Sequence, residues 1–279
     1  MKIITVELIE NFKNFLFNEE KAFATIEKYV HDVLNFKMWL SGSVVTKTEV
    51  LRYKRVLTEK YAPTSVNSII SSLNSFFSYN EWYECKVKTL KIQRQIFISK
   101  DRTLTKAEYE RLLAAAKYKG DERLYLLMQT ICSTGIRVSE LRFVTVEAVK
   151  SGQAIISCKG KLRVVMLTRL LCKMLKAYIK ENKIKRGPIF ITRTGKPLDR
   201  SNIWKLLKGL CERAGVSKNK VFPHNLRHLF ARTFYSLQKD IIRLADILGH
   251  TSVNTTRIYT IESGEVHRQQ MQELGLLRC

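Results

Sequence analysis

Apolar residues recur at helical spacing through the first third of the chain. The clearest stripe follows an i, i+3, i+4, i+7 pattern and consists of Val66, Ile69, Ile70, Leu73, Phe76 and Phe77. Another stripe runs from Ile26 to Leu34, and a first helix is expected around Val6–Phe17. Thr46 and Glu49 stand at the spacing of a capping box and open one more helix. These stripes predict four short helices that pack together as a small bundle.

Farther along, the pattern predicts strands. Two short apolar runs, Ala154–Ser157 and Arg163–Leu167, flank the turn Lys159-Gly160-Lys161 and predict a β-hairpin. The run Pro188–Ile191 predicts a third strand, and the remainder reads as helix. We therefore predict a mainly α protein with a small antiparallel β-sheet.

The changes of pattern also divide the chain. Residues 1–95 are expected to form a helical domain and residues 96–102, poor in helical pattern, a linker. A second domain spans residues 103–279 and opens with a capping box at Thr105–Glu108. Its tail, residues 263–279, carries several apolar side chains, so we expect it to pack on its own domain or on a neighbour.

Charge adds a partner to this picture. The net charge is +24 and the pI is near 9.9, which indicates a polyanionic partner. Residues 101–279 hold 34 basic against 15 acidic residues, and residues 150–220 hold 19 against 3. An imbalance this large and this local favours a nucleic-acid-binding face over an ordinary solvated surface.

Cysteine spacing and the N-terminus indicate a location. The six cysteines form no C-x-x-C pair and no metal-binding spacing with the five histidines. The N-terminal sequence lacks the layout of a signal peptide, and no apolar run reaches membrane-spanning length. We expect a cytoplasmic protein with reduced thiols and no membrane contact.

Five segments carry chemistry in a fixed order: STGIRVSEL (133–141), CKGKLR (158–163), HNLRH (224–228), LGH (248–250) and TTRIYT (255–260). Their candidate residues are Arg137, Lys159, His224, Arg227, His250 and Tyr259. Breaking and rejoining a phosphodiester requires cations on the non-bridging oxygens, a nucleophile, and an acid for the leaving oxygen. This set supplies all three without a metal ion, ATP or another cofactor.

The order and spacing of these motifs resemble the tyrosine recombinase family of phage-integrase-like and Xer-like enzymes. The resemblance covers residues 103–260 by motif and residues 1–95 by organisation. It implies an N-terminal four-helix core-DNA-binding domain and a C-terminal catalytic domain. It also implies a site-specific recombinase that cleaves and rejoins strands through a 3′-phosphotyrosyl intermediate. The implied partners are double-stranded DNA with short inverted repeats and a homo-tetramer assembled on two DNA sites.

Each candidate residue has an expected role. Arg137 and Arg227 can grip a phosphate bidentately. His224 can donate to the phosphate or accept a proton from the tyrosine, and His250 is expected to bond a non-bridging oxygen. Tyr259 is the expected nucleophile, because it alone among the eleven tyrosines follows an LGH motif by nine residues.

The supporting residues are less sharply defined. Lys159 precedes the hairpin glycine, where the family places its general acid, but the short turn leaves Lys161 as a rival. Lys161 and Arg163 are expected to contact DNA, and Glu140 to hold Arg137. His228 is expected to be structural.

Three other functions fit part of the pattern. A type IB topoisomerase-like enzyme shares the phosphate chemistry, and a non-catalytic accessory protein of the family would share the fold. A basic RNA-binding protein fits the charge, but no RNA-binding motif is present. Larger phage integrases of the family carry an extra domain, ahead of the core-binding domain, that binds arm-type DNA sites. Residues 1–95 leave little room for such a domain, so we expect a simple recombinase that acts on short inverted repeats. The DNA target stays open, as does the choice between integration or excision, inversion and dimer resolution.

Overall fold

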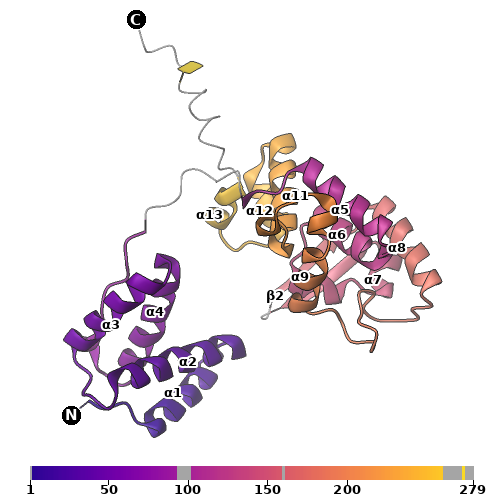
Figure 1. Ribbon diagram of the computed structural model, residues 1–279. Coiled ribbons are helices and arrows are strands. Elements are labelled where there is room, and N and C mark those ends of the chain that lie inside the picture. The colour runs from indigo at the N-terminus through magenta and orange to yellow at the C-terminus, as the bar shows by residue number, and fades with distance from the viewer. Residues whose placement is uncertain (1, 93–101, 159–160, 260–271, 274–279) are drawn as a thin grey trace, which may run out of the picture. The chain divides into compact units, whose positions relative to one another are not determined.

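The computed structural model describes residues 2–92, 102–158, 161–259 and 272–273, without the side chains of Cys158 and Lys161. The chain divides into two compact units, residues 1–94 and 95–279, each with its own apolar core (Figure 1). The predicted linker and tail lie almost wholly outside the described residues. No helix in the described ranges is long and apolar enough to cross a membrane.

The first unit is the predicted bundle of four α-helices, and it ends in a short 3-10 turn. The elements are α1 (Val6–Asn18), α2 (Phe23–Leu40), α3 (Lys47–Lys60), α4 (Pro63–Tyr79) and η1 (Tyr83–Cys85). Thr46 caps α3, with its hydroxyl accepting a hydrogen bond from the amide of Glu49 at 3.2 Å. Phe12 and Phe76 meet edge to face in the core, with ring centroids 5.3 Å apart. The apolar stripes are therefore core, as predicted.

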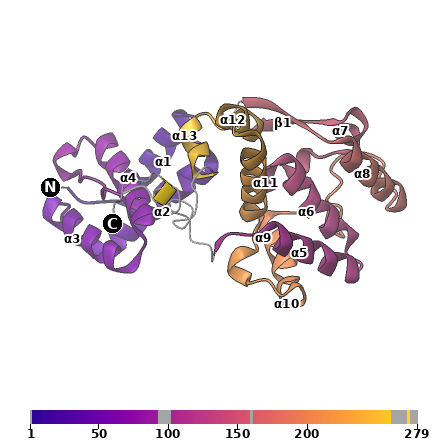
Figure 2. The same cartoon turned by 90° about the horizontal axis from the view of Figure 1, so that it is seen from above.

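The second unit is mainly helical and contains one β-hairpin. Its elements are α5 (Lys106–Tyr118), α6 (Glu122–Thr134), η3 (Val138–Phe143), α7 (Val146–Ser151), β1 (Gln153–Cys158), β2 (Lys161–Met166), α8 (Arg169–Glu181), α9 (Arg200–Lys208), α10 (Cys211–Ala214), η4 (Lys218–Lys220), α11 (Pro223–Gln238), α12 (Ile241–Leu248), α13 (Val253–Thr256) and η5 (Arg257–Tyr259). Helix α6 packs against α5, α8 and α11 and forms the centre of the unit. The hairpin extends from α12 toward α7 and α8 (Figure 2).

Alternation explains the hairpin. Strands β1 and β2 pair antiparallel, with Ile155 opposite Val164 and Cys158 opposite Lys161. Ala154, Ile156 and Val165 point into the core, whereas Ile155 and Val164 are exposed. The predicted small antiparallel sheet is confirmed, and it has two strands among the described residues.

The predicted third strand at residues 188–191 is wrong. Pro188 and Ile191 form isolated bridges to two different partners, Thr145 and Pro197, and neither joins the hairpin. Proline has no amide hydrogen to donate to a ladder, and the next two residues, Ile189 and Phe190, are buried in the core. The apolar run therefore serves packing rather than pairing.

Candidate active site

The C-terminal end of α12 gathers three arginines from three other elements. Three successive backbone carbonyls there each accept a hydrogen bond from a different guanidinium group. The pairs and their N–O distances are Arg163 to Ile247, 2.7 Å, Arg227 to Leu248, 2.8 Å, and Arg137 to Gly249, 3.2 Å. The last carbonyls of a helix lack partners within the helix, and they lie at the negative end of its dipole. This helix end therefore brings cations from the N-cap of η3, from β2 and from α11 to one place.

Arg137 is held by the carboxylate of Glu140. One Glu140 oxygen accepts the Arg137 backbone amide and the other accepts Nη1, both at 2.9 Å. The Arg137 side chain is still 39 % exposed, so part of its guanidinium faces outward. Burial by itself raises the pKa of Glu140, but its hydrogen bonds with Arg137 and Arg163 and the charge of Arg163 outweigh burial and leave the pKa lowered. The carboxylate is ionised and orients the arginine.

Arg227 lies inside the domain. Its residue is 2 % exposed, and its guanidinium donates to the carbonyls of Gly135 and Leu248, which end α6 and α12. Burial, followed by the charge of Arg137, lowers the pKa of Arg227 to about 10, while the nearby phenol of Tyr259 acts in the opposite direction. Arg227 therefore stays charged at neutral pH and links the two helix ends.

The hydrogen bonds of His250 fix its tautomer. Nε2 lies 3.1 Å from Nη2 of Arg227, and Nδ1 lies 2.8 Å from the hydroxyl of Thr256. A guanidinium can only donate, so Nε2 accepts and the ring proton resides on Nδ1. Burial and then the charges of the three arginines lower the pKa of His250 to about 4. Without a bound anion, His250 is neutral and its Nε2 is an acceptor.

Tyr259 packs within a row of rings. Its ring lies parallel to that of His250, with centroids 6.1 Å apart, and meets the edge of His228 at 4.9 Å. His228 in turn meets His224, with ring centroids 4.3 Å apart. Tyr259 is buried and belongs to the small apolar cluster that includes Leu244 and Leu248. The candidate nucleophile thus sits between two histidines and close to Arg227.

Both histidines of α11 are electron-pair donors at neutral pH. Burial, then the charge of His224, lowers the pKa of His228 to about 3. The pKa of His224 is also lowered, by desolvation first and then by Arg227 and Arg200. His224 is the more exposed of the two, so it can exchange a proton with a ligand.

A cavity opens beside these groups. Its volume is about 720 Å³, and its polar lining includes Arg137, Ser139, Glu140, Arg163, His250, Thr251 and Thr255.

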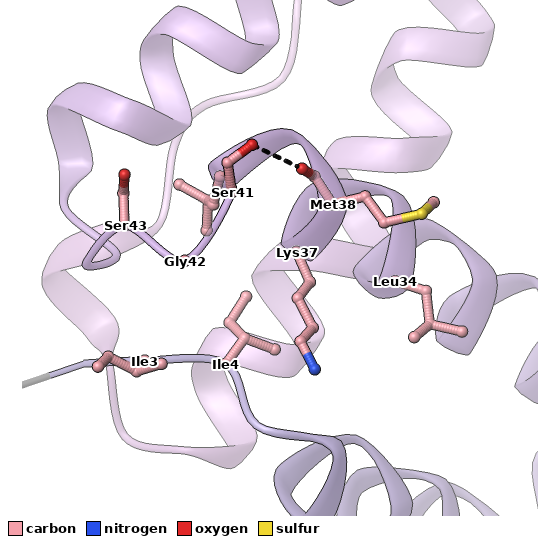
Figure 3. A pocket seen from close by; sticks show the side chains of 9 residues that line it. Ile3, Ile4, Leu34, Lys37, Met38, Ser41, Gly42 and Ser43 are labelled. Carbon is pink, nitrogen blue, oxygen red and sulfur yellow. Dashed lines mark hydrogen bonds between the residues drawn. The ribbon is translucent and has the colours of Figure 1, made fainter.

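A smaller hollow of about 270 Å³ lies in the first unit between the N-terminal segment and α2. Figure 3 shows that Lys37 is its one titratable side chain, beside apolar groups such as Ile4 and Met38. The described residues contain no cluster of His, Cys, Asp or Glu that could hold a metal ion.

Comparison with known proteins decides the family. The model of the phage integrase family matches residues 102–265, and that of the phage integrase N-terminal SAM-like domain matches residues 9–83. The chain belongs to the phage integrase family. The resemblance predicted from the motifs is therefore confirmed.

Several relatives of this family member are similar over nearly its whole length. Tyrosine recombinase XerA of Thermococcus kodakarensis is 30% identical, over 97% of this chain and 96% of that protein. Tyrosine recombinase XerD of Listeria innocua is 28% identical, over 91% and 93% of the two chains. A crystal structure of XerA recombinase has a TM-score of 0.54 and 26% identity, over 98% and 99% of the two chains. A lambda integrase dimer bound to a COC′ core site has a TM-score of 0.73 at 18% identity, over 92% and 77%, and shows the shared fold.

The structure brings five of the six predicted catalytic residues together. Arg137, Arg227, His250 and Tyr259 surround the end of α12, and His224 joins them through His228. Lys159 lies outside the described residues. Lys159 therefore stays the predicted catalytic lysine, with Lys161 as its rival.

Arg163 was expected to contact DNA, but its guanidinium is engaged inside the domain. It lies 2.5 Å from Glu140 and 2.7 Å from the carbonyl of Ile247, and its side chain is 16% exposed. The geometry therefore gives no support to a DNA contact by this residue.

Two residues near the site escaped the sequence analysis as functional groups. Thr256 supports His250, and a possible signal was its position six residues after that histidine in a short helical turn. His228, which was expected to be structural, lies against Tyr259. In HNLRH the phosphate-binding chemistry belongs to the HxxR pair His224 and Arg227, so the sequence carries no separate signal for His228.

Proposed function

We propose that this chain breaks and rejoins DNA strands through attack of Tyr259 on a phosphodiester bound beside α12. The chain is a tyrosine-type site-specific recombinase, the activity that its motifs predicted and that the names of its curated relatives state. The observation that carries the residue assignment is the position of Tyr259, which packs against His250 next to the buried cation Arg227.

In the first step, the phosphate enters the cavity at Arg137 and His250. Arg137 lines this cavity and binds the non-bridging oxygens. Arg227 lies buried behind His250, and its positive charge helps to stabilise the charge that develops on the phosphate. The phenolic oxygen of Tyr259 attacks phosphorus, and the bond to the 5′-oxygen breaks. The products are a 3′-phosphotyrosyl ester and a 5′-hydroxyl.

Two proton transfers accompany this step. Neutral His224 is the proposed acceptor for the proton of Tyr259. The leaving 5′-oxygen takes a proton from the hairpin lysine, for which Lys159 is the first candidate. The ester preserves the energy of the broken bond, so a 5′-hydroxyl of another strand can reverse the attack without ATP.

Binding of the phosphate also requires a change at His250. Its Nε2 is an acceptor in the unliganded site, so it cannot donate to a phosphate oxygen until it gains a proton. A phosphodiester anion beside the ring raises the pKa of the histidine and favours that proton. We therefore propose that DNA binding and protonation of His250 are coupled.

The proposed partners are double-stranded DNA with short inverted repeats and three further copies of the chain. Support comes from solved relatives, which include XerH bound to difH substrate and a lambda integrase tetramer bound to a Holliday junction. The net charge of +24 fits a DNA partner. We also propose a cytoplasmic location, supported by four described cysteines that form no disulfide.

Removal of the C-terminal tail tests whether the proposed tetramer depends on it. We propose that residues 263–279 dock on a neighbouring copy rather than on their own domain. Deletion of residues 264–279 should then leave binding to a single half-site intact while assembly of the two-site complex fails in native gel shifts. A truncated protein that recombines normally would show that residues 264–279 are not needed for assembly and would contradict this proposal.

A nicked suicide substrate tests the proposed function. The wild-type chain should form a covalent protein–DNA adduct on denaturing gels, whereas Tyr259→Phe should bind DNA with unchanged affinity and form none. Only the hydroxyl is lost in that variant, so the cationic site remains. An adduct that persists in Tyr259→Phe would assign the nucleophile to another residue. Relaxation of supercoiled DNA that lacks a recombination site would favour a topoisomerase-like enzyme.

A further inference from the structure

At the end of α12, both Nη atoms of Arg163 are engaged inside the domain, by Glu140 and by the carbonyl of Ile247, whereas part of the Arg137 guanidinium faces outward. We propose that Arg163 is a positioning residue, which holds Arg137 and His250 in place for phosphate binding without touching DNA. This inference rests on the proposed function, because it assigns a means of alignment to the same site.

The first connection runs through Glu140. Nη2 of Arg163 lies 2.5 Å from one oxygen of this carboxylate, which is 4% exposed. Glu140 in turn accepts both the backbone amide and Nη1 of Arg137. A buried carboxylate shared by two guanidinium groups has little freedom to rotate. Arg163 therefore fixes the carboxylate that orients Arg137.

The second connection runs through the turn before His250. Nη1 of Arg163 donates to the carbonyl of Ile247 at 2.7 Å. A Cβ atom added at Gly249 would lie 2.5 Å from Cδ of Arg163 and 3.0 Å from its Nη1, so the arginine stem lies directly against this glycine. Gly249 has φ +62° and ends α12 immediately before His250. Arg163 therefore also fixes the turn that aims the imidazole.

Loss of Arg163 removes both connections at once. Glu140 keeps Arg137 as its one cation among these contacts, and the Ile247 carbonyl loses its donor. A displacement of about 1 Å in a reacting geometry can cost on the order of 100-fold in rate. We expect Arg163→Met to lower the single-turnover cleavage rate about 10- to 100-fold with DNA affinity changed less than about threefold. Arg163→Lys should recover part of the rate, because one ammonium can pair with Glu140 but cannot also reach Ile247 as a planar fork does.

A matched control separates alignment from general stability. Arg123 is also part-buried, donates to the carbonyl of Ile191 at 2.6 Å, and like Arg163 has a buried Nε without a hydrogen-bond partner. Arg123→Met should lower the melting temperature about as much as Arg163→Met and leave the cleavage rate unchanged. Equal losses of rate in the two variants would show that only stability is involved and would overturn the proposal.

Two further measurements test the route of action. If Arg163 acts through His250, the factor lost on His250→Ala should be at least about threefold smaller in the Arg163→Met background than in wild type. Fully multiplicative effects would contradict this route.

A substrate with a 5′-bridging phosphorothioate needs no proton from the hairpin lysine. It should not rescue Arg163→Met, and a rescue would show that Arg163 acts through that lysine instead. The wild-type chain serves as reference throughout. Its failure to form an adduct would overturn the proposed function, whereas a wild-type adduct with a normal rate in Arg163→Met would overturn this inference alone.

Discussion

Two buried carboxylates, one in each unit, show what separates a structural ion pair from an active site. In the first unit, Asp32 pairs with Lys28 at 2.5 Å and accepts from the hydroxyl of Ser72 at 2.7 Å. Lys28 stands one turn away on the same helix and is 41% exposed. In the second unit, Glu140 pairs with two arginines, one at the N-cap of η3 and one on β2. Burial and pairing are common to both sites, so neither distinguishes them.

The two sites differ in the further contacts that their cations make. Lys28 also reaches Ser68 and Ser72, and its contacts end within the bundle. Arg137 continues to the carbonyl of Gly249 and lines a cavity of about 720 Å³. After burial, the charges of the arginines that converge from separate elements lower the pKa of the histidine beside them, His250. An anion relieves this repulsion, and the site is therefore preorganised for a phosphate.

We expect the largest loss of cleavage rate when the hairpin lysine is replaced. Lys159→Ala should slow cleavage on the order of 100-fold or more, because protonation of the leaving oxygen is lost, whereas Lys161→Ala should have a small effect. Single-turnover cleavage of a suicide substrate measures both. The 5′-bridging phosphorothioate should restore cleavage by Lys159→Ala. If it rescues Lys161→Ala instead, the two assignments are reversed.

A matched pair of substitutions breaks the comparison directly. Glu140→Gln should reduce the cleavage rate about 10- to 100-fold, because the amide loses the charge that holds two arginines. Asp32→Asn should cost about 1 kcal/mol of stability and leave the cleavage rate at saturating DNA unchanged. Melting temperatures and single-turnover rates of the two variants give the answer. Equal rate losses would mean that Asp32 matters to catalysis and that the two carboxylates do not differ in function.

The smallest effect concerns pH. The folded-state pKa values of His228 and His250 are about 3 and about 4, below the ordinary histidine value of about 6.5. Below that value the unfolded chain takes up protons that the folded chain does not, so stability falls as pH decreases from 7.5 to 5. We expect a loss on the order of 1 kcal/mol for each histidine, seen as a lower melting temperature.

Variants sharpen this pH dependence. His228→Phe keeps a ring against Tyr259 and should flatten the profile, whereas His31→Gln, at an exposed position of the first unit, should not. Bound DNA should flatten it as well, since a phosphate favours protonated His250. Parallel profiles for wild type and His228→Phe would remove this histidine as a cause.

Much of the fold follows from local pattern. The stripes of the first unit and the caps at Thr46 and Thr105 specify their helices because each signal acts within a few residues. The segment at residues 188–191 could not be assigned from its pattern, since a short apolar run fits a strand and a packed loop equally well. What decided it was tertiary: Ile189 and Phe190 fill the core.

The site divides in the same way. Motif order and spacing predicted Arg137, Arg227, His250 and Tyr259 as site residues, and the structure brings these four together. The arrangement at the end of α12 could not be predicted, because it depends on three elements far apart in sequence that meet three adjacent carbonyls. Arg163 looked like one more DNA-contacting cation of a basic hairpin for that reason. Its partners, Glu140 and Ile247, are visible only in the folded chain.

The residue that becomes joined to DNA can be identified by peptide mapping, and its identity decides whether Tyr259 is the nucleophile. The trapped wild-type adduct can be digested with nuclease and trypsin and its nucleotide-linked peptide sequenced by mass spectrometry. Cleavage after Arg257 and Arg268 releases residues 258–268, which contain Tyr259 as their one tyrosine. The account predicts the nucleotide on this peptide, linked through a 3′-phosphate. A nucleotide on residues 233–239, which contain Tyr235, or on any other peptide would contradict it.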